Sequence, residues 1–357
     1  MAGKLRYGIV GLGSIGTVHT EAIRKSVPEA EVAAMCDILP DRLAQKADAY
    51  GVKGRYADFR EMVTKESLDA VYVCVPNHLH HPVTMAALAA GRAVFCEKPM
   101  AMSAAQAREM SAAAKKAGKA LQLGMVTRLR ANPQTVKSFV DRGFLGRIYH
   151  ARVVIRRHRG IPGMGGWFTT KAKAGGGAVI DVGVHYLDQS LWLTNRWKPA
   201  RVSASTYAMF GPRMREYRYV SMWAGPPDYN GTFDVDDYAC AMVRFADRTT
   251  MAVEVSWAAN VRPESYIEIL GDKAGVRLHD TGELTFITEV EGSLADVTPQ
   301  FDTNVDIFGE QARIFARVVR GEVPPPATAE QGIAVMSLID AIYRSSESGR
   351  EVEVEGA

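Results

Sequence analysis

The stretch "YGIVGLGSIGTVHT", residues 7–20, decides the first half of the fold, because it sets a glycine pattern between an apolar run and a helical pattern. Gly11, Gly13 and Gly16 have the spacing G-x-G-x-x-G. Such glycines allow a tight turn and close backbone approach, so that the helix N-terminus binds a pyrophosphate through its free N–H groups. A lone glycine pattern is weak evidence, but Asp37 ends the next apolar run, 21 positions after Gly16. A carboxylate on the adenosine ribose is expected near that spacing.

The first 124 residues continue as short apolar runs that alternate with helical patterns, such as "DAVYVCVP", "HPVTMAALAAG" and "AVFCEKP". This rhythm predicts that residues 1–124 form an NAD-binding Rossmann domain, a doubly wound parallel α/β sheet. Residues 125–357 begin with one helical pattern and continue as longer runs rich in β-branched residues, with hairpin-like spacing. They predict a second, α+β domain with a large, mostly antiparallel open sheet.

The composition narrows the class of protein. A length of 357 residues favours two domains, and a net charge of +3 is far below the clustered excess typical of nucleic-acid-binding proteins. The N-terminus lacks the continuous apolar segment of a signal peptide, and no run approaches the length of a membrane span. The four cysteines form no C-x-x-C pair, which suits reduced thiols. We expect a soluble cytoplasmic protein that binds neither nucleic acid nor membrane.

The residues around Asp37 also predict the cofactor. A carboxylate at this position accepts hydrogen bonds from the ribose hydroxyls and repels a 2′-phosphate, and the following residue is Ile38 rather than a cation. NAD is therefore favoured over NADP. Arg42 is the one nearby cation that could turn toward a phosphate.

The loops that follow the apolar runs are the next candidates, because ligands of open α/β sheets bind beyond the carboxyl ends of the strands. In "VPNHLHHP", Pro76 and Asn77 are expected to line the nicotinamide side, and one imidazole to cap or contact the cofactor. The histidine spacing matches no zinc pattern, so no metal is expected. In "CEKPM", Lys98 precedes Pro99, which stiffens the turn that presents the ammonium group. The residues predicted to contact the cofactor are Gly11, Gly13, Ser14, Ile15, Gly16, Asp37, Arg42, Pro76, Asn77, His80, Glu97, Lys98 and Trp167.

The stretch "GGGAVIDVGVHYLD", residues 175–188, places an acid and an imidazole four positions apart. Its alternation could be that of a half-buried strand, in which Asp181 and His185 would stand about 13 Å apart. A helix makes the two residues neighbours and gives one apolar stripe that continues into "QSLWL". We expect the helix, with the glycine run admitting a ligand close to the backbone. The pair alone fits a catalytic site and a self-satisfied core pair equally well.

Taken together, "VGLGSIG", "VPNHLHHPVTMAALAAGRAVFCEKPM" and "GGGAVIDVGVHYLD" resemble the glucose–fructose oxidoreductase / inositol dehydrogenase / rhizopine-catabolism (Gfo/Idh/MocA) family of nicotinamide-dependent oxidoreductases. The resemblance implies that residues 125–357 bind substrate and that their open sheet often mediates homodimers or homotetramers. It also implies a catalytic trio, in which the lysine of the E-K-P motif is Lys98 and the helical acid and histidine are Asp181 and His185.

The expected reaction is reversible oxidation of a secondary hydroxyl of a sugar, cyclitol or glycoside. His185 would take the hydroxyl proton, Lys98 would stabilise the alkoxide or relay the proton, and Asp181 would orient a partner. The sequence leaves open whether His185 or Lys98 is the immediate base. The predicted substrate-binding residues are Lys98, Arg157, Trp167, Phe168, Asp181 and His185.

Several alternatives stay open at this point. Arg157 belongs to a basic strand end that could be solvated or lie at a subunit contact, and Trp167 and Phe168 could fill a domain interface instead of covering a sugar ring. Two other functions also fit. One is a glycoside hydrolase that acts by transient oxidation and elimination, and the other is a catalytically idle sugar or nucleotide sensor.

Overall fold

The computed structural model describes residues 3–356, which divide into two compact units. The first unit comprises the described part of Met1–Val126 together with Asp306–Ile333, and the second comprises Thr127–Val305 with the described part of Ala334–Ala357. No helix within residues 3–356 combines the length and the apolar composition that a membrane crossing requires.

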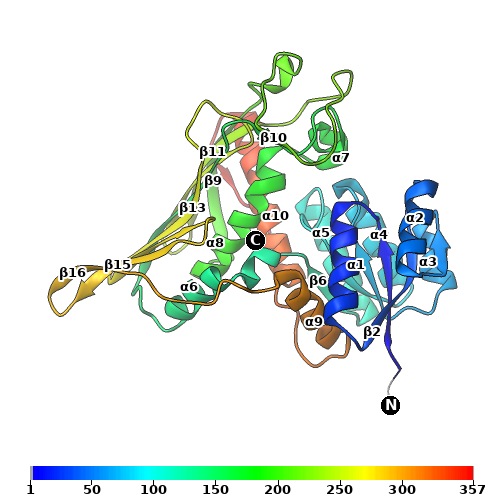
Figure 1. Cartoon of the computed structure of the whole chain (residues 1–357). Helices are drawn as coiled ribbons and strands as arrows, with labels where there is room; N and C mark the ends of the chain where they lie inside the picture. Colours follow the sequence, from blue (N-terminus) through cyan, green and yellow to red (C-terminus); the bar gives the residue numbers. More distant parts are fainter. Residues whose placement is uncertain (1–2, 357) are drawn as a thin grey trace. The chain divides into compact units, whose positions relative to one another are not determined.

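The first unit is built on a six-stranded, fully parallel sheet with the order β3-β2-β1-β4-β5-β6. Figure 1 shows the N-terminal part of this unit in blue and cyan. This order is that of a Rossmann sheet, as predicted. The strands are β1 (Leu5–Val10), β2 (Ala30–Cys36), β3 (Gly54–Tyr56), β4 (Ala70–Val73), β5 (Ala93–Cys96) and β6 (Leu121–Leu123). The helices are α1 (Ser14–Ser26), α2 (Pro40–Tyr50), α3 (Phe59–Lys65), α4 (His80–Ala89), α5 (Ala104–Ala117) and α9 (Ile307–Val319).

Helix α9 corrects the predicted domain division of 1–124 and 125–357. Phe315 of this helix is fully buried in the same hydrophobic cluster as Tyr7, Tyr72 and Phe95, and its ring lies 5.2 Å from that of Tyr72. The apolar stripe of α9 therefore completes the Rossmann core, although the helix follows the second sheet in the sequence. The chain leaves the first unit near residue 126 and returns to it at residues 306–333.

The second unit is built on a nine-stranded sheet with the order β16-β15-β14-β13-β7-β12-β11-β9-β17. Only the neighbours β7 and β12 run parallel, so the sheet is mostly antiparallel, as predicted. The strands are β7 (Ile148–Arg156), β9 (Pro199–Tyr207), β11 (Tyr238–Phe245), β12 (Thr250–Ser256), β13 (Glu264–Gly271), β14 (Ala274–His279), β15 (Leu284–Val290), β16 (Ser293–Val297) and β17 (Val352–Glu353). A separate short pair joins β8 (Gly160–Ile161) to β10 (Ser221–Met222).

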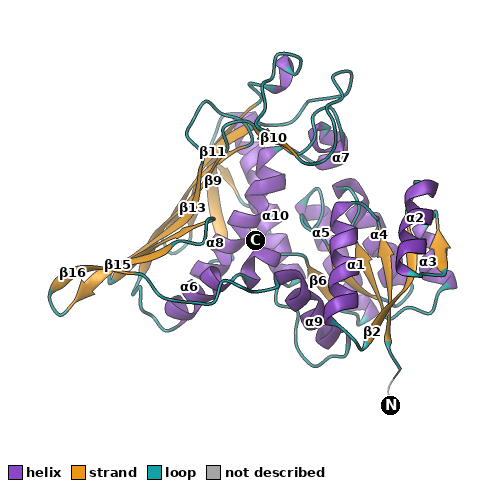
Figure 2. Ribbon diagram, viewed as in Figure 1, coloured by secondary structure: helices purple, strands orange, loops and turns teal. Residues whose placement is uncertain are grey.

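Helices cover one face of this sheet and leave the other open (Figure 2). The covering helices are α6 (Ala131–Asp141), α8 (Val184–Thr194) and most of α10 (Ala329–Ser348), and a short helix, α7 (Lys171–Ala174), lies in the loop before α8. Along β12, Met251, Val253 and Val255 are buried, whereas Ala252 and Glu254 between them are partly exposed. This alternation follows from the pleat of a strand with one covered face.

Candidate active site

The glycine loop of the first unit has the geometry of a pyrophosphate cradle. Gly11 has a φ of +90°, and a Cβ there would lie 2.3 Å from the carbonyl oxygen of Cys74. A Cβ on Gly16 would lie 1.9 Å from the carbonyl oxygen of Gly11, so both positions require glycine. The space beside Gly13 is open, and no side chain caps the N-terminus of α1, whose first turn contains Ser14 and Ile15. This end of the helix therefore offers N–H groups and room to a phosphate.

Asp37 lies at the end of β2 and is held by four donors. Its Oδ2 atom accepts from the backbone N–H of Leu12 and from Nε of Arg42, both at 2.8 Å. Its Oδ1 atom accepts from the backbone N–H of Leu39 at 2.9 Å and from Nη2 of Arg42 at 2.8 Å. Burial alone would raise the pKa of Asp37, but these hydrogen bonds outweigh burial and lower it. The Arg42 side chain is 37% exposed, so it has room to turn away from the carboxylate, and the contact of Asp37 with ribose hydroxyls stays a prediction.

The loop after β4 leads into the buried His80. His80 is 1% exposed, with Nδ1 2.6 Å from the carbonyl oxygen of Pro99 and Nε2 2.8 Å from that of Val75. Both ring nitrogens lie near backbone carbonyl oxygens, so His80 ties two loops together, and its contact with the cofactor stays a prediction. Asn77 is buried at the start of a 3₁₀ turn, and its contact with the cofactor, like that of Pro76, stays a prediction. Across residues 3–356, no three His, Cys, Asp or Glu side chains are grouped to hold a metal ion.

The loop after β5 carries Glu97 and Lys98 in the first unit. Glu97 is 7% exposed, and its Oε1 atom lies 2.7 Å from Nε2 of His19, a residue of α1. Its Oε2 atom accepts from the backbone N–H of Lys98 at 3.1 Å. Glu97 therefore anchors the loop, and the sequence carries no signal for its partner His19. The contact of Glu97 with the cofactor stays a prediction.

Asp181 and His185 lie in one continuous helical segment of the second unit, as predicted. Val179–Gly183 form a π-helical turn that runs directly into α8. Asp181 is 7% exposed, and its Oδ2 atom accepts from Nε1 of the fully buried Trp257 at 3.0 Å. His185 is partly exposed. The segment thus fixes the acid and leaves the imidazole partly exposed, with its Nδ1 atom buried. Wide turns of this kind are frequent at functional sites.

The glycines before this helix serve packing rather than ligand approach, which corrects the predicted reason for them. A Cβ on Gly177 would lie 1.8 Å from the carbonyl oxygen of Asp236, and one on Gly176 would lie 2.1 Å from the hydroxyl of Tyr343. The Asp236 carboxylate accepts from the backbone N–H groups of Gly177 and Val179 at 2.7 and 3.0 Å. Asp236 therefore fixes the start of the helical segment, a role that no motif in the sequence indicated.

Three further substrate candidates lie in the second unit. Trp167 and Phe168 stack on each other with ring centroids 3.7 Å apart. Arg157 follows β7, donates its backbone N–H to Ser256 at 3.0 Å and places its guanidinium 5.1 Å from the ring of Trp223. All three side chains are partly exposed, and their contacts with a substrate stay predictions.

Two family models match the chain. One, described as "Oxidoreductase family, NAD-binding Rossmann fold", matches residues 5–125, and the other, described as "GFO/IDH/MocA C-terminal domain", matches residues 134–277. The chain belongs to the Gfo/Idh/MocA family. This Gfo/Idh/MocA protein is accordingly an oxidoreductase that uses NAD, bound by the first unit.

Its relatives extend over the whole chain. D-glucoside 3-dehydrogenase of Escherichia coli strain K12 is 30% identical over 352 residues, which cover 98% of this chain and 97% of that protein. Myo-inositol 2-dehydrogenase of Thermotoga maritima is 26% identical over 354 residues, covering 98% and 99%. Among solved structures, levoglucosan dehydrogenase in complex with NADH and levoglucosan has a TM-score of 0.83 at 22% identity, covering 99% of this chain and 100% of that one. This last likeness shows a shared fold.

Proposed function

We propose that this Gfo/Idh/MocA enzyme oxidises a secondary hydroxyl of a sugar, cyclitol or glycoside to a ketone, with NAD as hydride acceptor. The observation that carries the proposal is the helical segment in which Asp181, fixed by the indole of Trp257, lies four residues before the partly exposed His185. The substrate class is supported by relatives that are named as D-glucoside and myo-inositol dehydrogenases.

The proposed roles follow from the charges that the reaction moves. Oxidation of an alcohol removes a hydride from carbon and a proton from oxygen, and NAD, when bound, takes the hydride. His185 or Lys98 accepts the proton, because an amine or imidazole placed at the hydroxyl can act as general base. Where His185 is the base, the ammonium of Lys98 stabilises the developing alkoxide, and in either case the Asp181 carboxylate balances positive charge and orients its partner. Arg157, Trp167 and Phe168 would bind the remainder of the substrate.

A substrate panel tests the proposal. The protein is incubated with NAD and a set of inositols, free sugars and glycosides, and NADH absorbance and aglycone release are followed together. Accumulation of NADH supports the dehydrogenase. Release of aglycone without net NADH would favour the hydrolase that acts by transient oxidation, and binding without either product would favour a sensor.

Site variants test the assigned residues. Lys98→Met and His185→Asn should each lower kcat by about 10²-fold or more, as expected for loss of a general base or of an alkoxide stabiliser. His81→Asn is the matched control, because His81 lies in the first unit and pairs with the exposed Glu109 at 2.7 Å. Full turnover in both site variants would show that the assignment is wrong. The pH profiles of the two variants identify the base, since only loss of the base removes its limb of the profile.

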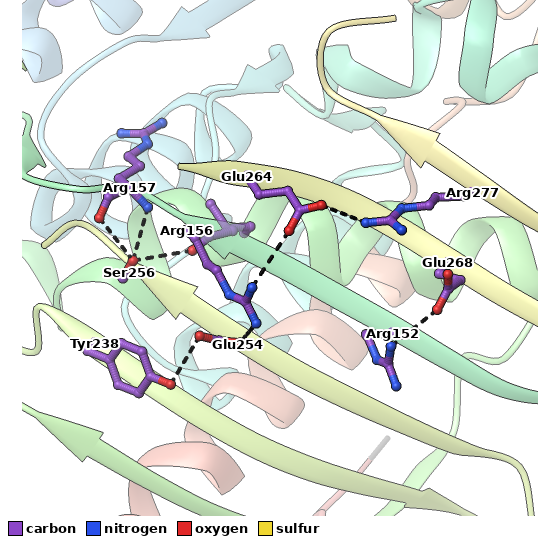
Figure 3. Close-up of polar contacts among 10 residues, drawn as sticks. Arg152, Arg156, Arg157, Tyr238, Glu254, Ser256, Glu264, Glu268 and Arg277 are labelled. Carbon is purple, nitrogen blue, oxygen red and sulfur yellow. Dashed lines mark hydrogen bonds and ion pairs between the residues drawn. The ribbon is translucent and has the colours of Figure 1, made fainter. Parts of the chain in front are cut away.

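We also propose that the open face of the second sheet mediates a homodimer or homotetramer. Figure 3 shows polar residues in pairs across this face. Arg156 contacts Glu254 at 2.7 Å and Arg277 contacts Glu264 at 2.6 Å, while Met242 is 37% exposed. Ion pairs that neutralise the charges of this face, together with an exposed apolar side chain on the neighbouring strand β11, are compatible with an interface of mixed polar and apolar composition. Met242→Glu should shift the molar mass measured by light scattering toward the monomer, and an unchanged mass would locate the interface elsewhere.

The cytoplasmic location inferred from the sequence stays part of the proposal. The four cysteines are free thiols, in accordance with a reducing compartment.

A further inference from the structure

Two buried histidines hold the segment Glu97–Pro99 from its two ends. His19, from α1, contacts the side chain of Glu97 at 2.7 Å, and His80, at the start of α4, contacts the carbonyl oxygen of Pro99 at 2.6 Å. Both rings are 1% exposed. Lys98 lies between the two anchored residues, so its backbone is fixed on both sides by side chains outside the motif.

The His19–Glu97 contact acts on Lys98 through both oxygens of one carboxylate. While Oε1 faces His19, Oε2 accepts the backbone N–H of Lys98 at 3.1 Å. Burial alone would raise the pKa of Glu97, but the hydrogen bond and charge of His19, and then the charge of Lys98, lower it. Gly124 leaves room for this carboxylate, since a Cβ there would lie 2.9 Å from Oε1. Glu97 is thus an ionised group held in one place beside the lysine.

The surroundings of His19 leave its ring little freedom. Ring centroids of Tyr72, Phe95 and Phe308 lie 5.5, 4.9 and 5.7 Å from that of His19. Replacement of a buried ion pair by apolar residues is often neutral or stabilising, so such a pair is poorly explained by stability alone. Its geometric effect here is to fix the position of Glu97 and, through Glu97, that of Lys98.

We propose that His19 is a positioning residue for Lys98, acting through Glu97, and that His80 holds the same loop from the other side. The inference rests on the proposed function only in taking Lys98 as the catalytic lysine. Since a misplacement of about 1 Å can cost about 10²-fold in rate, loosening this anchor lowers kcat while the glycine loop and its affinity for NAD stay intact.

The test compares His19→Leu with the matched control His81→Leu, which breaks an equally short but exposed histidine–glutamate pair. His19→Leu should lower kcat by about 10- to 100-fold and leave the Kd of NAD within about threefold, whereas the control should change neither. His19→Gln, whose amide can still donate to Glu97, should recover part of the loss. If His19→Leu does not fold, the comparison is made with His19→Gln.

A readout that does not need turnover separates this inference from the proposed function. The rate at which trinitrobenzenesulfonate modifies Lys98 is measured by mass spectrometry, with the exposed Lys119 as internal reference. The rate at Lys98 should change in His19→Leu and Glu97→Gln while that at Lys119 stays constant. Unchanged kcat and unchanged labelling of Lys98 in His19→Leu would overturn the inference. Changed labelling together with a fully active Lys98→Met would refute the proposed function and leave the positioning intact.

Discussion

Asp236 is the buried carboxylate on which the start of the candidate catalytic helix depends. Besides the N–H groups of Gly177 and Val179, it accepts the hydroxyl of Tyr343 at 2.8 Å, and its backbone carbonyl accepts the N–H of Ala178 at 2.9 Å. Asp236→Ala leaves three donors without their acceptor. Since each orphaned buried donor costs about 1–3 kcal/mol, the variant should lose at least about 3 kcal/mol of stability.

Its chain neighbour supplies a matched control. Asp237 is 1% exposed and accepts from the backbone N–H groups of Met209, Phe210 and Gly211 at 3.1, 2.6 and 3.2 Å. Asp237→Ala therefore also orphans three donors, and its cost in stability should be similar. Those donors lie in a different segment from the π-helical turn, however. Only Asp236→Ala should disturb the placement of the acid and the imidazole on the helix.

The assay measures stability and activity together. Urea unfolding is followed by hydrogen exchange of peptides from each unit, because the two units need not unfold as one. Activity is expressed per folded molecule. We expect similar losses of stability in the two alanine variants, but a further loss of about tenfold or more in kcat only in Asp236→Ala. The reasoning fails if Asp236→Ala is as stable as the parent protein, or if it loses no more activity than Asp237→Ala.

The same residue gives a signed pH dependence. Burial raises the pKa of Asp236 above its ordinary value of 3.8, with its hydrogen bonds offsetting part of that effect. The folded protein thus binds this proton more tightly than the unfolded chain, so the contribution to stability is complete below about pH 4 and is lost as the pH rises through the folded pKa. Asp236→Asn cannot ionise. The stability of the parent protein, measured relative to that variant, should therefore fall as the pH rises above about 4.

Two further substitutions test the sites. Trp257→Phe removes the 3.0 Å donor to Asp181 and should lower kcat by about tenfold with KM little changed, and a change confined to KM would contradict an orienting role. Asp37→Ser removes the repulsion of a 2′-phosphate and frees Arg42, so the ratio of kcat/KM for NADP to that for NAD should rise by about tenfold or more. An unchanged ratio would show that selectivity lies elsewhere.

The sequence predicts those features that depend on local pattern. The parallel sheet of the first unit could be predicted because strands and helices alternate along the chain, and the rules for connecting parallel strands allow few topologies for such a pattern. The helix at residues 179–194 could be predicted because its apolar residues keep a 3.6-residue period over the whole segment, whereas the strand-like alternation covers only a few residues. The wide turn inside that helix has no periodic signature, so the pattern located the helix without its π-helical start.

Features that depend on distant partners could not be predicted. The amphipathic period of α9 shows that this helix buries one face, but not which sheet it packs against. Phe315 of α9 packs in the core of the first unit, although the strands of the second sheet separate it in sequence from the rest of that core. The glycine run permits close approach, and only the fold shows that the approaching group is Asp236 rather than a ligand. His80 likewise looks like a loop residue in the sequence, but it starts α4, and one of its two carbonyl partners, Pro99, comes from the distant loop after β5.

The two candidate catalytic segments are supported in the same physical way. In the first unit, His19 engages Glu97 beside Lys98, and in the second, Trp257 engages Asp181 directly. Each supporting group is buried and hydrogen-bonded, so its removal lowers the stability of the protein and also misplaces the candidate catalytic residue that it holds. A substitution at such a group therefore lowers the folded fraction and the rate per folded molecule together. An activity measured on total protein would overstate the effect of the substitution on the chemical step. Only the rate per folded molecule separates the loss of folded protein from the loss of catalytic rate.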